Sequence, residues 1–294
     1  MEELAGVVAI PVTPFDADGA VDRDALVRVL RRVVDGGVRV VTPNGNTGEF
    51  YALTPDEARL AVEVTVDAVG GEAAVVVGVG GAVPVAVDAA RHAQRSGAVA
   101  VMVHQPVHPY VSADGWVEYH RAIAAAVPDL GVLLYVRSPR IGGAEIARLR
   151  ALAPNVVGVK YAVPDPVRFG VVAGEAGPGP VWIAGLAESS APGYFALGAT
   201  GFTSGLVNVH PGLSLRLLDA LRAGDGDAVR AVWRSIEPFE RLRAAGESEH
   251  NVSVVKEALA QLGVCGRDVR PPSSTVDAAT RERIGRLLAD WGLA

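Results

Sequence analysis

The chemistry that this sequence could carry centres on one lysine in an apolar run. Lys160 lies in NVVGVKYAVPD (155–165), where four of the five residues before it are valine or glycine. Burial or a neighbouring cation lowers the pKa of an amine, so that part of it is neutral and can attack a ketone. The resulting Schiff base is an electron sink that stabilises an enamine. The alternative is a surface lysine at a strand end that pairs with a carboxylate.

A tyrosine occupies a similar place in the preceding apolar run. Tyr135 is near the end of GVLLYV (131–136). If the two runs are neighbouring parallel strands, their ends are close enough for Tyr135 and Lys160 to share a pocket. A phenol there could pass protons during imine formation and during cleavage of a C–C or C–O bond. The alternative is a core tyrosine whose hydroxyl is satisfied at the rim.

The loop NGNTGEF (44–50) could bind an anion. Small residues around Thr47 let backbone N–H groups approach a carboxylate, and the threonine hydroxyl adds a donor. Asn46, Thr47 and Gly48 are therefore candidate substrate-binding residues. The loop is equally consistent with an ordinary tight turn after a strand, and we interpret Glu49 as an anchor of the loop.

The elements that must position these residues are short valine-rich runs. Most are apolar without alternation, which is typical of strands covered on both faces. The last run ends in Thr203 and Ser204, two further candidate substrate-binding residues. The eight runs are 6–12, 38–42, 73–79, 98–104, 131–136, 155–160, 180–185 and 199–205.

Segments with helical spacing separate the runs. One of them, 54–71, begins with Thr54 as N-cap and Pro55 in the first turn. Eight strand–helix units predict right-handed crossovers and a closed (β/α)8 TIM barrel. The alternative is a doubly wound open sheet, which would need two more strands than is usual for it. In a barrel, the active site lies at the carboxyl ends of the strands, where Lys160 and Tyr135 fall.

The pattern changes after about residue 222, where helical segments follow one another without strands. We therefore predict a barrel over 1–222 and a helical C-terminal extension over 223–294, packed on the barrel. The helical segments are 226–246, 251–263 and 277–292.

Composition limits the partners. The net charge is −6 and no run of Lys or Arg appears, which argues against nucleic acid. The single cysteine, Cys265, cannot form an intrachain disulfide, and no Cys/His cluster indicates a metal site. The N-terminus lacks a signal-peptide pattern, and no apolar run approaches the ~20 residues that span a bilayer. We expect a cytoplasmic protein without a membrane partner.

Taken together, these motifs resemble the dihydrodipicolinate synthase / N-acetylneuraminate lyase family of Schiff-base-forming barrel enzymes. The resemblance covers essentially the whole chain and depends on the order and spacing of several motifs. They are IPVTPF (10–15), GNTGE (45–49), the tyrosine at 135, VGVK (157–160), GATGFTSGLVNVHP (198–211) and VVKEALAQLG (254–263).

The resemblance implies that Lys160 forms the Schiff base, that Tyr135 is its proton-transfer partner and that Thr47 binds the keto-acid carboxylate. It also implies that no metal or organic cofactor is needed. A homo-oligomer, commonly a tetramer built from dimers, is expected on the same ground.

The chain departs from the synthase pattern at two places. Asn46 stands where the family usually has a relay threonine or serine, and QPVHPY (105–110) puts His108 near the second relay tyrosine. Arg140, with Arg137 as an additional cation, could bind a second carboxylate. Alternatively, His108 is structural or a subunit contact, and both arginines face solvent. A hydroxylated substrate would suit the polar side chains of Asn46, His108, Arg137, Ser204 and Asn208.

Our leading hypothesis is a lyase that acts through a Schiff base on a 2-keto acid, either by aldol cleavage or by dehydration of a 2-keto-3-deoxy sugar acid. The second hypothesis is a dihydrodipicolinate synthase that condenses pyruvate with aspartate semialdehyde. The third is a catalytically silent barrel that binds a ligand, which the presence of both Lys160 and Tyr135 disfavours.

Overall fold

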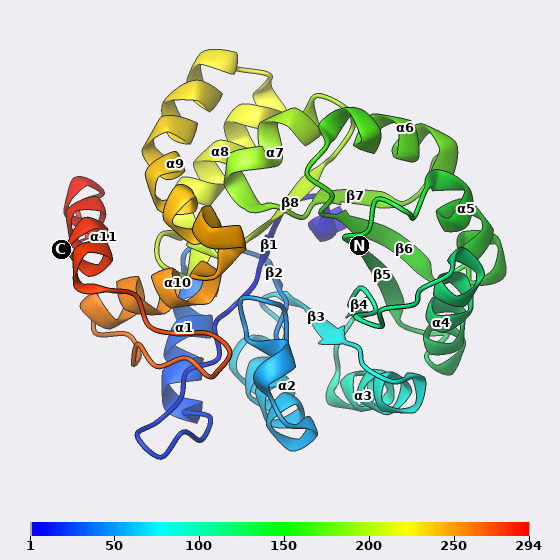
Figure 1. The fold of residues 1–294 in the computed structure, drawn as a ribbon, viewed down its shortest axis with the longest axis horizontal. Coiled ribbons are helices and arrows are strands. Elements are labelled where there is room, and N and C mark those ends of the chain that lie inside the picture. Colours follow the sequence, from blue (N-terminus) through cyan, green and yellow to red (C-terminus); the bar gives the residue numbers. More distant parts are fainter. Residues whose placement is uncertain (1, 294) are drawn as a thin grey trace.

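The predicted barrel is confirmed. A computed structural model describes residues 2–293, in which eight parallel strands close in sequence order, so that β8 pairs with β1 (Figure 1). The closed sheet excludes the doubly wound alternative. The strands are β1 (Val7–Ala9), β2 (Val40–Val41), β3 (Ala74–Val79), β4 (Ala100–Val103), β5 (Gly131–Val136), β6 (Val156–Tyr161), β7 (Val181–Ala184) and β8 (Gly201–Ser204).

A helix follows each strand and covers the outside of the barrel. Thr54 caps α2 as expected: its side chain accepts from the backbone N–H of Glu57, whose carboxylate bonds back to Thr54. The helices are α1 (Arg23–Asp35), α2 (Pro55–Val69), α3 (Val83–Ser96), α4 (Ala113–Ala126), α5 (Gly143–Leu152), α6 (Pro166–Ala176), α7 (Ala187–Phe195) and α8 (Pro211–Ala223). Short 3-10 turns are η1 (Glu2–Leu4), η2 (Phe50–Ala52) and η3 (Leu206–Asn208).

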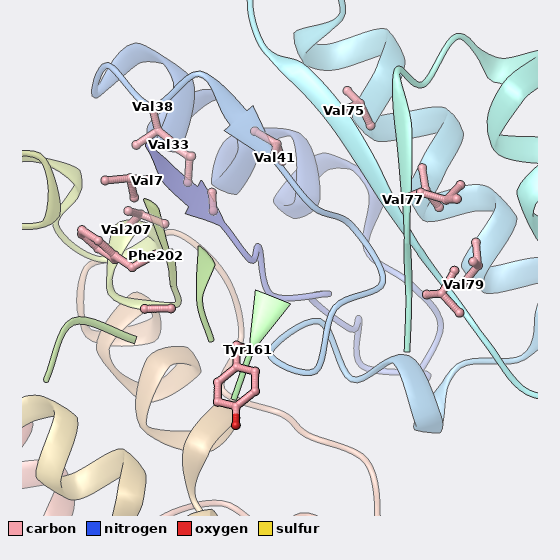
Figure 2. Packing of buried hydrophobic residues seen from close by; sticks show 14 of the residues in the cluster. Val7, Val33, Val38, Val41, Val75, Val77, Val79, Tyr161, Phe202 and Val207 are labelled. Atoms are coloured by element: carbon pink, nitrogen blue, oxygen red, sulfur yellow. The ribbon is translucent and has the colours of Figure 1, made fainter. Parts of the chain in front are cut away.

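The strands are apolar throughout because both of their faces are buried. Leu133 and Tyr135 of β5 belong to a small cluster inside the barrel, whereas Val132 and Leu134 belong to a larger layer between strands and helices. Figure 2 shows part of this outer layer, including Tyr161. Side chains alternate along a strand, so Lys160, which precedes Tyr161, faces the inside.

The C-terminal extension is also confirmed. It consists of α9 (Gly226–Ser248), α10 (Asn251–Gln261) and α11 (Ala278–Asp290), with α9 packed on α7 and α8 (Figure 1). The helical path of α9 is interrupted at Ala245–Glu247, where Gly246 and Glu247 have φ of 57° and 58°. The division into two domains remains a prediction. No helix within residues 2–293 has both the length and the apolar character needed to cross a membrane.

Candidate active site

Lys160 and Tyr135 are paired directly across β5 and β6. They are register partners in the parallel ladder, and the Nζ atom of Lys160 lies 4.0 Å from the centroid of the Tyr135 ring. Only 4% of the Lys160 surface is exposed. Among residues 2–293, no carboxylate forms an ion pair with Lys160. The alternative of a surface lysine paired with an acid is therefore wrong.

Burial sets the proton affinities of both groups. Loss of solvation, assisted by the charge of Arg137, lowers the pKa of Lys160 to about 7. Burial raises the pKa of the Tyr135 phenol to about 12, although Arg137 opposes the rise. At neutral pH, a large part of Lys160 is a neutral amine beside a phenol that keeps its proton.

A pocket of about 550 Å³ opens above this pair. Thr203 at the end of β8 lines it, and its hydroxyl donates to the carbonyl of Ala184 over 3.5 Å. The opposite wall comes from α9 and the start of α10. The pocket thus joins the barrel mouth to the C-terminal extension.

The loop after β2 presents free donors to this pocket. Asn46 and Thr47 line it, and the Asn46 Nδ2–H donates to the Tyr135 hydroxyl oxygen over 3.2 Å. Within residues 2–293, the Thr47 hydroxyl and the backbone N–H groups of Asn46 and Thr47 donate no hydrogen bond to the protein. They are free to bind a carboxylate.

Gly48 has a different position from its two neighbours. Its N–H donates to the carbonyl of Gly45 over 3.0 Å, and its carbonyl accepts from the Thr13 hydroxyl over 2.8 Å. A Cβ at Gly48 would lie 2.9 Å from the carbonyl oxygen of Pro11. Gly48 therefore allows close packing of the loop, and its own N–H is not available to a ligand.

The C-terminal extension holds this loop in place. The Glu49 carboxylate lies 2.5 Å from the Nζ atom of Lys256 in α10 and accepts from the backbone N–H of Arg270 over 2.9 Å. Both side chains of this ion pair are buried. The arrangement agrees with our interpretation of Glu49 as an anchor. Lys160 and Lys256 are the two lysines of the chain.

Three cationic or titratable candidates lie farther along the rim. Arg137, His108 and Arg140 line a neighbouring depression of about 460 Å³, and only Arg137 also borders the lysine pocket. His108 is exposed, and its Nδ1 accepts from the backbone N–H of Tyr110 over 3.1 Å. The structure thus brings Arg137 to Lys160 but leaves His108 and Arg140 outside the lysine pocket.

Two polar residues near β8 are engaged within the protein. The Ser204 hydroxyl donates to the Glu188 carboxylate and accepts from the Val207 N–H over 3.0 Å. Ser204 is fully buried and is not part of the pocket wall, so the structure does not agree with substrate contact by this residue. The Asn208 side-chain amide bonds the backbone of Val12 and Ile10, which ties η3 to the segment after β1.

Sequence reasoning missed His104 at the end of β4. Its Nε2–H donates to the carbonyl of Asn44 over 2.8 Å, and its ring stacks on Phe50 with centroids 4.2 Å apart. Burial lowers its pKa to about 3, so the ring is neutral. His104 thus contacts the loop that carries Asn46 and Thr47 at both of its ends, Asn44 and Phe50. Its position at the end of an apolar run was the available signal.

Sequence reasoning also missed Glu240, Arg243 and Asn251, which line the pocket from α9 and α10. No local pattern connects these helices with the barrel mouth. Among residues 2–293, no group of three or more His, Cys, Asp or Glu side chains could hold a metal ion. The absence of a cofactor remains a prediction.

Comparisons with known proteins agree with this architecture. The crystal structure of dihydrodipicolinate synthase from Bacillus clausii superposes with a TM-score of 0.95, is 40% identical and covers 99% of each chain. An uncharacterized DapA-like lyase of Halobacterium salinarum is 37% identical over 99% of this chain and 95% of its own length. A probable 5-dehydro-4-deoxyglucarate dehydratase of Methylobacterium radiotolerans is 30% identical over 97% of this chain and 95% of its own length.

The match to a protein family also covers nearly the whole chain. Residues 3–290 match the dihydrodipicolinate synthetase family. The matched range contains the barrel, the lysine pocket and nearly all of the C-terminal extension. The chain therefore belongs to the dihydrodipicolinate synthetase family of lyases.

Proposed function

We propose that this protein is a Schiff-base-forming lyase that acts on a 2-keto acid, in particular a 2-keto-3-deoxy sugar acid. The observation that carries the proposal is a buried lysine without a carboxylate partner, 4.0 Å from a tyrosine ring, in a pocket with free anion donors. An amine in this setting is a nucleophile at neutral pH.

Substrate binding begins at the carboxylate. The Thr47 hydroxyl and the N–H groups of Asn46 and Thr47 bind it, and Arg137, which lines the same pocket, adds positive charge. The neutral amine of Lys160 attacks C2 of the ketone to form a carbinolamine. Loss of the C2 oxygen as water gives the protonated imine. Tyr135 donates the proton that this oxygen needs and recovers it from the substrate.

The imine then accepts electrons from a bond at C3. In dehydration, a C3 proton leaves and the C4 hydroxyl departs as water. In aldol cleavage, the C4 hydroxyl loses its proton and the C3–C4 bond breaks, which leaves the enamine of pyruvate and a free aldehyde. C3 of the enamine then takes up a proton, which restores the imine. Hydrolysis of the imine returns the Lys160 amine in both cases. Relatives named as dehydratases support the first route.

The test is to trap the imine with pyruvate and borohydride and to measure the mass of the protein. We expect one reduced adduct, located by peptide mapping on Lys160 and absent in Lys160→Ala. Because the chain has two lysines, Lys256 is the one other lysine side chain on which peptide mapping could find the adduct. Binding of pyruvate without a trapped adduct would instead support the silent barrel.

A second candidate is condensation of pyruvate with aspartate semialdehyde. It is favoured by the solved dihydrodipicolinate synthase that superposes on this chain. Against it, Asn46 replaces a relay hydroxyl and His108 lies outside the lysine pocket. Turnover assays with both substrate types on protein that traps pyruvate distinguish the two enzymes. The tetramer implied by the family resemblance remains a prediction.

A further inference from the structure

The wall of the pocket formed by α9 contains a buried ion pair that the steps above do not use. Arg243 and Glu240 are each 5% exposed, and Arg243 Nη1 lies 2.6 Å from Glu240 Oε1. Asn251 extends the set, because its Oδ1 accepts from Arg243 Nη2 over 2.6 Å. All three residues line the same pocket as Lys160.

The charged end of Arg243, rather than its aliphatic stem, lies at the barrel mouth. A Cβ at Gly205, directly after β8, would lie 2.8 Å from the Arg243 Cζ atom. Gly205 also lines the pocket. Only glycine leaves room for the guanidinium at this strand end. Within residues 2–293, three of the five N–H groups of Arg243 donate to Glu240 and Asn251, and the other two have no acceptor in the protein.

The chemistry of this wall matches hydroxyl groups. The positive charge of Arg243 is balanced by Glu240, and the exposed Glu247 at the same wall adds a negative charge. A carboxylate on the ligand can only accept hydrogen bonds, so Glu240 and Glu247 would repel it at this wall. A hydroxyl both donates and accepts, and it can bind Arg243 and Glu240 together.

A buried ion pair is not by itself a stabilising feature, since apolar residues of similar volume are often as good. The adjoining backbone adds to the free-energy cost of this wall in the folded protein. Glu247 and Ser248 have φ of 58° and 70°, values that are unfavourable for residues with a side chain. Both residues line the pocket. Strain and buried charge thus coincide at one wall.

We propose that Glu240, Arg243 and Asn251 form a hydroxyl-binding wall that determines specificity, and that the preferred substrate carries hydroxyl groups on the carbons beyond C3. This inference rests on the proposed Schiff-base function. Thr47 and Lys160 hold the first two carbons of the substrate, and the chain then extends toward α9.

The experiment compares three six-carbon 2-keto acids: 2-keto-3-deoxygluconate, 2-oxohexanoate without hydroxyls, and 2-oxoadipate with a far carboxylate. Imine trapping as a function of concentration gives the apparent affinity for each. We expect 2-keto-3-deoxygluconate to bind at least tenfold more tightly than the other two, because buried polar groups left without partners penalise the analogues.

The variant Arg243→Met/Glu240→Leu removes the pair without leaving one buried charge. It should abolish this preference, with each apparent affinity expressed relative to that of the same variant for pyruvate. Arg243→Lys should retain part of the preference. The matched control is Arg241→Met/Glu237→Leu, a more exposed pair on the same helix that does not line the pocket. An unchanged preference in the first variant would overturn the inference. So would a variant that binds only 2-oxoadipate more weakly than wild type does. Absence of trapping by wild type would instead overturn the proposed function.

Discussion

The Lys160 Nζ atom lies over the Tyr135 ring at 4.0 Å because the two residues are register partners on neighbouring strands. Their relative position is therefore fixed by the barrel ladder and does not depend on a flexible loop. In the proposed reaction, the amine and the tyrosine would therefore need little rearrangement before they act.

The first prediction concerns the pH dependence of imine formation. The pKa of Lys160 is lowered to about 7, chiefly by burial and secondly by Arg137. The rate of pyruvate trapping should therefore rise with pH, with a midpoint near 7, and level off above it. Arg137→Gln should move the midpoint upward. A midpoint near the ordinary lysine value of about 10.4 in wild type would contradict the assignment.

The second prediction concerns Tyr135 as the proton carrier. Tyr135→Phe should lower kcat by about 100-fold or more, since a positioned acid–base group contributes about 10²–10⁴. The KM should change little. Tyr161→Phe is the matched control, because Tyr161 is buried in the outer layer on the adjacent strand. Equal losses in both variants would indicate a packing effect instead.

The third prediction concerns the carboxylate site. Thr47→Val removes a hydroxyl that could bond a charged group, an interaction worth about 1.5–3 kcal/mol. The KM for the keto acid should rise about 10–100-fold while kcat falls little. Thr42→Val, at the buried end of the preceding strand, is the isosteric control. A fall in kcat without a change in KM would exclude Thr47 from substrate binding.

The fourth prediction concerns the ion pair between the loop and the extension. Lys256→Met leaves the Glu49 carboxylate buried without its partner and should lower the free energy of unfolding by about 3–5 kcal/mol. It should also raise the KM, because the loop that carries Thr47 loses its anchor. Lys256→Met/Glu49→Gln should regain most of the stability. Denaturant unfolding and steady-state kinetics measure the two effects. No gain in the double variant would mean that the pair does not act as a unit.

The fifth prediction concerns the stability cost of the reactive amine. The pKa of Lys160 is about 7 when folded and about 10.4 when unfolded. The unfolded state thus binds more protons between these values, and wild-type stability rises with pH across that window. Lys160→Met should be inactive and more stable than wild type. Its advantage should be largest below pH 7 and should shrink toward pH 10, as measured by denaturant unfolding.

The fold was predictable because barrel strands carry an unusually simple signal. Both faces of a strand such as β5 are covered, so the strand is apolar at every position. Strand order then places residues such as Lys160 and Tyr135 at one rim without further information. Strand ends were less predictable: β2 has only Val40 and Val41, whereas the apolar run covers 38–42.

The rest of the site could not be predicted, because it depends on contacts between distant segments. His104 is placed by its stacking on Phe50 of another loop, whereas His108, four residues later, is exposed. Arg243 reaches the pocket only because α9 packs on α7 and α8, which brings its guanidinium against Gly205. No local sequence pattern contains that contact.

Both lysines of this chain are buried, one in the pocket at the barrel mouth and one against Glu49, so the outer surface carries no lysine amine. Positive charge on the surface comes from arginine, whose guanidinium stays protonated and does not form imines under ordinary conditions. A reactive aldehyde or ketone in solution can therefore find a free side-chain amine only by entering the barrel. A lyase that acts on such carbonyl compounds would thus have no exposed lysine side chain with which they could form an imine.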